Sequence, residues 1–305
     1  MTCVACMPTR CACRVAGNFG TCATRDAASP LGSTSSVPDP GAPPPDTPHP
    51  DTPPTDSTPV VSADPTPHSG VAVPPGNWGL GEVFGGIIAS QFLAALCTVI
   101  AMAIAGWDRP SQIPMWGLAV LQIPLWAGWM GAVAVAGRKG NGIVTDFGFT
   151  IRPVDVPLGL TIGVALQLVL VPIVYFPILR LSGLTNDDLS KPAHALADRA
   201  HGWVGWVLLF LLVGIGAPVV EELFYRGLLQ RALIKRGLPP WLSVLLGAAL
   251  FSAMHLEPLQ FVGLFLFGAV SGWLALRTRR LGPSIAAHVG FNTTTVVTLL
   301  LLRGR

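Results

Sequence analysis

The feature that most constrains this chain is a series of long apolar stretches without a charged side chain. Six such stretches occupy residues 83–107, 111–137, 156–179, 202–220, 237–254 and 258–276. A seventh, 281–302, holds His288 as its one ionisable group. A helix that crosses a bilayer needs about 20 predominantly apolar residues, and none of these runs shows the alternation typical of strands. We therefore expect an all-α, polytopic membrane helix bundle with about seven transmembrane helices.

Composition supports this fold class and excludes others. Of the 305 residues, 51% are hydrophobic and 11% are charged, whereas a soluble domain has roughly 25% charged residues. The chain also lacks a basic stripe with interleaved aromatic residues, so we expect no nucleic-acid partner. The lipid bilayer is the expected partner, and the expected location is a multi-pass position in the cell membrane.

The first part of the chain has a different composition. Proline occupies 14 of the 38 positions from Pro38 to Pro75, and such a segment has little apolar surface to bury. We therefore expect a disordered tail over residues 1–78 and a transmembrane domain over residues 79–305. Five of the six cysteines lie within the first 22 residues. A zinc site is not expected there, because no second Cys pair completes a set of four ligands. We interpret these residues as a Cys-rich leader or as the product of a start codon assigned too far upstream.

Basic residues near the ends of the apolar stretches indicate an orientation. A cytoplasmic N-terminus places ten Lys and Arg residues inside and six outside. Because short cytoplasmic loops carry the excess of Lys and Arg, we predict that the N-terminus is cytoplasmic.

Ionisable side chains within the apolar half form three motifs. Glu221 and Glu222 precede Arg226, Phe251 precedes His255, and His288 precedes Asn292. Within each motif the residues four positions apart share a helix face. Because ionisable groups are costly inside a membrane, such residues are candidates for function.

The spacing assigns different tasks to the two glutamates. Glu222 is placed for an ion pair with Arg226, so Glu221 faces another way and needs a histidine or a water molecule as its partner. Pro218 is expected to free the carbonyl of Gly214 and to kink the helix. Glu221 lies 16 residues before Gly237 and His255 lies 18 after it, so both lie about 25 Å from that turn of a helical hairpin.

The three motifs, in the order EExxxR, FxxxH and HxxxN, resemble those of the CPBP intramembrane proteases. This family includes type II CAAX prenyl endopeptidases and bacterial proteins linked to bacteriocin self-immunity. The resemblance covers about residues 160–302. It implies that Glu221 is the general base that activates water, with His255 helping to hold that water. It also implies that His288 and Asn292 stabilise the oxyanion.

The remaining motif residues would support the site. The resemblance assigns Glu222 and Arg226 to structure, and Phe251 is expected to pack against His255 and orient it. The implied function is an intramembrane endopeptidase that acts on a membrane-associated peptide or protein substrate. We expect its cavity to open to the cytoplasm, and a prenylated substrate is not implied.

Two questions remain open at this point. Glu221, His255 and His288 are an adequate donor set for a catalytic zinc ion. However, the HExxH signature is absent, and Asn292 suits an oxyanion better than zinc, so we favour a mechanism without a metal cofactor. The alternative function is a non-catalytic immunity or scaffold protein that keeps the polar cluster for folding. A proton-linked transporter is a third hypothesis, but the two halves of the chain show no repeat.

Overall fold

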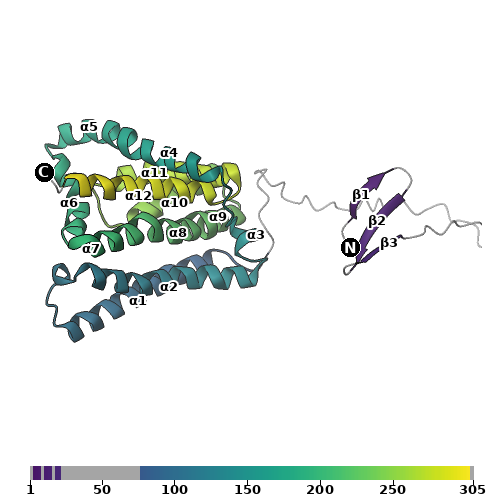
Figure 1. Cartoon of the computed structure of the whole chain (residues 1–305), viewed down its shortest axis with the longest axis horizontal. Coiled ribbons are helices and arrows are strands. Elements are labelled where there is room, and N and C mark those ends of the chain that lie inside the picture. Colours follow the sequence, from purple (N-terminus) through teal and green to yellow (C-terminus); the bar gives the residue numbers. More distant parts are fainter. Residues whose placement is uncertain (1–2, 8–9, 16–17, 22–75, 303–305) are drawn as a thin grey trace, which may run out of the picture. The chain divides into compact units, whose positions relative to one another are not determined.

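The computed structural model describes residues 3–7, 10–15, 18–21 and 76–302 (Figure 1). The chain divides into two compact units, Met1–Ser62 and Ala63–Arg305, and each is described by itself.

The first unit contains a small antiparallel sheet. Its strands β1 (Cys3–Met7), β2 (Arg10–Val15) and β3 (Asn18–Thr21) pair in sequence order. This differs from the predicted tail, in which we expected disorder and no strands. Runs of four to six residues are too short for their pattern to stand out in a sequence. The rest of the predicted tail, up to residue 75, lies outside the described residues.

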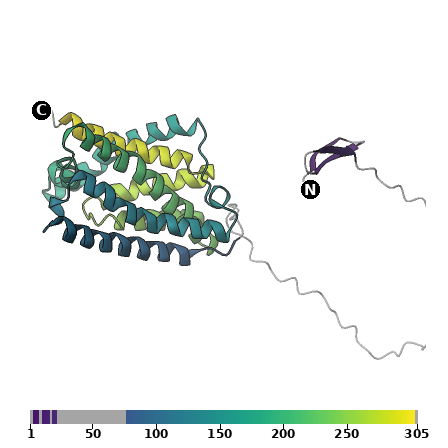
Figure 2. The same ribbon diagram turned by 60° about the horizontal axis from the view of Figure 1, so that its bottom comes forward.

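The second unit is a bundle of helices that run side by side (Figures 1 and 2). Its helices are α1 (Leu80–Ala105), α2 (Met115–Lys139), α3 (Ile143–Phe147), α4 (Asp155–Ala165), α5 (Val171–Ser182), α6 (Asn186–Ala197), α7 (Gly202–Leu209), α8 (Ala217–Glu222), α9 (Gln230–Lys235), α10 (Pro240–Ala253), α11 (Phe261–Thr278) and α12 (Gly282–Leu302). Three π-helical segments, Leu166–Leu170, Phe210–Gly216 and Leu223–Leu229, join α4 to α5, α7 to α8 and α8 to α9.

The predicted membrane bundle is confirmed. Within residues 76–302, six helical segments are long and apolar enough to cross a membrane. The seventh expected span is the shorter helix α10, whose 14 residues extend about 21 Å, against a hydrocarbon core of about 30 Å. Large apolar side chains face outward, including Ile88 and Ile104, which are 69% and 82% exposed. Such a surface suits lipid, and the chain is a multi-pass membrane protein.

Hydrogen bonds tie the connections of the bundle together at each end. At one end, which we call the basic end (residues 76–80, 138–155, 231–240 and 277–282), the Arg231 guanidinium donates to the carbonyl of Asp146 and the Arg280 guanidinium pairs with Asp155. At the other end, the α6 end (residues 106–114, 183–201 and 254–260), Arg199 donates to the carbonyls of Pro110 and Ile113.

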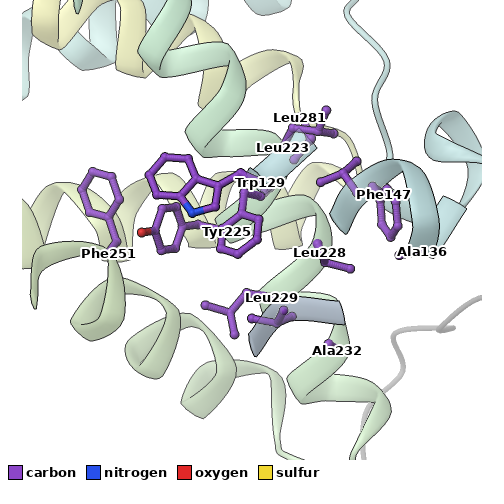
Figure 3. Packing of buried hydrophobic residues seen from close by; sticks show 14 of the residues in the cluster. Trp129, Ala136, Phe147, Leu223, Tyr225, Leu228, Leu229, Ala232, Phe251 and Leu281 are labelled. Carbon is purple, nitrogen blue, oxygen red and sulfur yellow. The ribbon is translucent and has the colours of Figure 1, made fainter. Parts of the chain in front are cut away.

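Aromatic side chains form much of the core (Figure 3). The rings of Trp129 and Phe224 stack with their centroids 5.4 Å apart, and Tyr225 meets Phe251 edge-to-face at 5.3 Å. Trp78, which we placed in the disordered tail, is also buried and packs on Phe147. The helical unit therefore begins packing before residue 79.

Close packing of α4 against α12 fixes the position of the last helix. Gly163 lies against the backbone of α12, and a side chain added there would overlap the carbonyl oxygen of Ala287. The neighbouring residue on α12 is His288. The contact between these two helices therefore fixes the position of His288 in the bundle.

Replacing Gly163 with alanine should destabilise the bundle. The new methyl group has to push α4 away from α12, which we expect to cost about 1–3 kcal/mol. The matched control is Gly131→Ala, because a side chain at Gly131 meets no atom within 4 Å. Unfolding of both variants in detergent micelles measures the difference. Equal stability of the two variants would contradict the close packing.

Candidate active site

The helix that carries the two glutamates is irregular on both sides of them. Helix α8 holds Glu221 and Glu222 between the π-helical segments Phe210–Gly216 and Leu223–Leu229. In the first segment the N–H of Ala217 donates to the carbonyl of Leu212, five residues back. Turns of this kind are rare and occur frequently at functional sites.

This irregularity corrects the expected effect of Pro218. In a regular α-helix the missing N–H of Pro218 would free the carbonyl of Gly214. The π-helical register shifts the pairing by one residue, so Pro218 falls opposite the carbonyl of Val213. Proline has no N–H to donate to this carbonyl. The Asn292 side chain supplies the donor, and its Nδ2 donates to the Val213 carbonyl at 2.8 Å. An amide nitrogen carries two hydrogens, so the second one remains for another acceptor.

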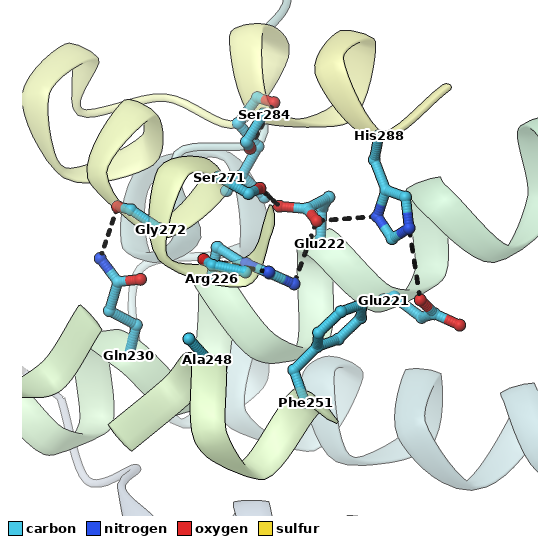
Figure 4. A network of polar contacts seen from close by, with 12 residues as sticks. Glu221, Glu222, Arg226, Gln230, Ala248, Phe251, Ser271, Gly272, Ser284 and His288 are labelled. Atoms are coloured by element: carbon cyan, nitrogen blue, oxygen red, sulfur yellow. Dashed lines mark hydrogen bonds and ion pairs between the residues drawn. The ribbon is translucent and has the colours of Figure 1, made fainter. Parts of the chain in front are cut away.

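Glu222 is fully buried and has three polar partners from three helical segments (Figure 4). Its Oε1 lies 3.0 Å from Nη1 of Arg226, which is the ion pair that the sequence predicts. Its Oε2 accepts a hydrogen bond of 2.7 Å from the hydroxyl of Ser271. Nδ1 of His288 lies 2.9 Å from Oε1. The buried charge is therefore neutralised and hydrogen-bonded, as a buried charge must be.

His288 lies between the two carboxylates (Figure 4). Its Nδ1 faces Glu222, while its Nε2 lies 3.7 Å from Oε2 of Glu221. The imidazole is 3% exposed and the Glu221 side chain 13%. With Glu222 ionised, Nδ1 acts as the donor to it.

Phe251 lies between the two histidine rings. Its centroid is 4.7 Å from that of His255 and 5.7 Å from that of His288, edge-to-face in both pairs. The Arg226 guanidinium lies over the same ring, 4.6 Å from its centroid. Nδ1 of His255 is 2.8 Å from the Phe251 carbonyl. When Nδ1–H donates to that carbonyl, Nε2 of His255 is left available, and Phe251 acts as a support.

All four side chains that the sequence assigns to catalysis line one cavity of about 740 Å³. They are Glu221, His255, His288 and Asn292. The supporting residues Glu222, Arg226 and Phe251 are not among its lining residues. Three separate segments of the chain therefore meet at one cavity. The Glu222–Arg226 ion pair lies behind the residues that line it.

The sequence reasoning missed several contacts that position this site. Ser271 and the carbonyl of Gly268 on α11 bind Glu222 and Arg226, respectively. One turn further on, Nε2 of Gln230 donates to the carbonyl of Gly272. The sequence feature that could have revealed these contacts is the segment from Gly268 to Gly272, which is rich in small residues. Small residues allow helix backbones in a membrane to approach closely.

The donor atoms do not fit a metal site as they lie. Across the described residues, no group of three His, Cys, Asp or Glu side chains is placed to hold a metal ion. Of the proposed zinc ligands, His288 already directs Nδ1 at Glu222, and His255 directs Nδ1 at a backbone carbonyl. These contacts leave Nε2 of both rings free, as in histidines that bind a metal through that atom, so the absence of a metal cofactor stays a prediction. The chemistry below is derived from the protein side chains and water.

Comparison with known families agrees with this geometry. Residues 203–294 match the family described as type II CAAX prenyl endopeptidase Rce1-like. This segment is similar to the Rce1-like family. It runs from α7 into α12 and contains all three motifs, so the predicted resemblance is confirmed there, over less than a third of the 305 residues. No curated protein and no solved structure gives a significant match.

Removing Arg226 from the Rce1-like segment should destabilise it strongly. Arg226→Leu leaves the Glu222 carboxylate without its guanidinium partner, and an unpaired buried charge costs about 3–5 kcal/mol. The control is Arg236→Leu, since Arg236 is exposed and surface changes stay within about 0.5 kcal/mol. Unfolding in detergent micelles measures both. A loss for Arg226→Leu no larger than that of the control would show that the ion pair is not essential.

Proposed function

We propose that the chain is an intramembrane endopeptidase that hydrolyses a peptide bond with water activated by Glu221. The observation that carries this proposal is the position of His288, held by Glu222 on one side and facing Glu221 on the other. The cavity that exposes Glu221 also exposes His255 and Asn292. The similarity of residues 203–294 to the Rce1-like family supports the same class of activity.

The reaction follows from these positions. The Glu221 carboxylate takes a proton from water, and the resulting hydroxide attacks the carbonyl carbon of the substrate. Nε2 of His255 accepts a hydrogen bond from the water and so orients it. The protonated Glu221 then gives its proton to the leaving nitrogen as the C–N bond breaks, leaving a new carboxylic acid, an amine and the regenerated Glu221 carboxylate. General-base catalysis of this kind contributes typically a factor of about 10²–10⁴.

Two donors are available for the oxyanion of the tetrahedral intermediate. One is the second Nδ2 hydrogen of Asn292, whose amide is fixed in place by the Val213 carbonyl. The other is Nε2–H of a protonated His288, whose ring is fixed by Glu222. Donors held in advance at a site of low dielectric stabilise developing charge well, since they need no rearrangement during the reaction.

A non-catalytic scaffold accounts less well for Glu221. Glu222 already has three polar partners, which link α8 to α11 and α12. The Glu221 carboxylate has no hydrogen bond to any described residue, and its nearest ionic partner is His288 at 3.7 Å. A carboxylate at a membrane-buried position is costly. Such a group is expected where it has a chemical task, and a scaffold gives it none.

The location of the protein follows from the same family and from its apolar surface. We propose that it spans the cell membrane, with the N-terminal side of α1 in the cytoplasm. Its substrate is a membrane-associated peptide or protein, because the site lies among membrane-spanning helices.

Glu221→Gln should abolish proteolysis without preventing insertion. Glutamine keeps the shape of the side chain but cannot take a proton from water, so we expect cleavage to fall by about 10²–10⁴-fold. The assay uses the full-length chain in liposomes with a library of fluorescence-quenched peptides.

The matched control is Asp187→Asn, which removes a carboxylate from the exposed start of α6 and should leave cleavage unchanged. Retained cleavage by a folded Glu221→Gln protein would remove the base assignment. The scaffold hypothesis predicts no change in function for either variant.

A further inference from the structure

The cavity extends from the polar cluster to the α6 end of the bundle. Besides the four site residues, its walls include Pro110, Ile113, Ala195 and Arg199. Pro110 and Ala195 are exposed at that end. In the described part of the chain, no residue of the basic end lines the cavity. The mouth is therefore at the α6 end, one helix length away from the basic end.

The two ends differ in their basic residues. Within residues 76–302, nine of the thirteen Lys and Arg residues other than the buried Arg226 lie at the basic end: Arg138, Lys139, Arg152, Arg231, Lys235, Arg236, Arg277, Arg279 and Arg280. The other four lie at or near the α6 end: Arg109, Arg180, Lys191 and Arg199. Lys and Arg in short loops remain on the cytoplasmic side during insertion, so this bias places the basic end in the cytoplasm.

We propose that the cavity receives its substrate from the extracytoplasmic side of the membrane. This inference rests on the proposed function, which identifies the molecule that occupies the cavity as a substrate. It differs from the expectation that the cavity opens to the cytoplasm. That expectation and a cytoplasmic N-terminus are incompatible, because the chain enters α1 at the basic end and the mouth lies at the opposite end.

The walls of the cavity indicate the kind of segment that fits. Between the mouth and Glu221 they are mainly apolar and include Leu118, Leu121, Leu125 and Leu212. An extended apolar segment would bury its side chains against them, and its backbone would reach the polar cluster. The substrate is therefore an apolar stretch of an exported or membrane-anchored polypeptide, at the point where it leaves the outer face of the bilayer.

Cysteine labelling tests the orientation of the mouth without any need for proteolysis. In the full-length chain with its six cysteines replaced by serine, one new cysteine is introduced at a time. Ser111→Cys marks the mouth and Val154→Cys marks the basic end, and both positions are exposed. Spheroplasts are treated with a membrane-impermeant maleimide before or after lysis. A second pair, Asn186→Cys and Pro239→Cys, at exposed positions of the two ends, repeats the test should a first variant fail to fold.

We expect Ser111→Cys to be labelled equally before and after lysis, and Val154→Cys to be labelled only after lysis. The reverse pattern would overturn the inference, and so would labelling of both positions in intact spheroplasts. Loss of cleavage in Glu221→Gln is measured separately. A cytoplasmic mouth in an active protease would refute only the side of entry, whereas an extracytoplasmic mouth in an inactive protein would refute only the proteolysis.

Discussion

The buried charge of Glu222 is the constraint on which the rest of the site depends. A carboxylate that is inaccessible to water is tolerable only when it is paired and hydrogen-bonded. Its partners come from its own helical segment, from α11 and from α12, through Arg226, Ser271 and His288. This charge therefore links three spans, and it orients the imidazole ring of His288.

The functional geometry follows from that orientation. With Nδ1 of His288 directed at Glu222, Nε2 can face only the cavity and Glu221. Asn292 lies four residues further along α12, on the same face, where it reaches the Val213 carbonyl left without a donor by Pro218. In the proposed mechanism, stability and reactivity are divided between adjacent glutamates. Glu222 is held by its protein partners, and Glu221 is proposed to act on water.

Local rules predicted a large part of this arrangement. Stretch length predicted the spans, the four-residue spacing predicted the Glu222–Arg226 pair, and counting residues from Gly237 placed Glu221 and His255 at one depth. The π-helical register around α8, and hence the partner of Asn292, depends on contacts between helices, which spacing alone does not reveal. The same holds for Ser271. The short strands near the N-terminus, the shortness of α10 and the position of the cavity mouth were also beyond those rules.

The central claim, that Glu222 holds His288 in place, is tested most directly by a double-mutant cycle. The free energy of unfolding in detergent micelles is measured for the unmodified chain, Glu222→Gln, His288→Gln and the double variant. Contacting residues in one network show coupling of about 0.5–3 kcal/mol, and we expect a value in this range because the two side chains share a hydrogen bond. Additive effects, with coupling indistinguishable from zero, would contradict the account.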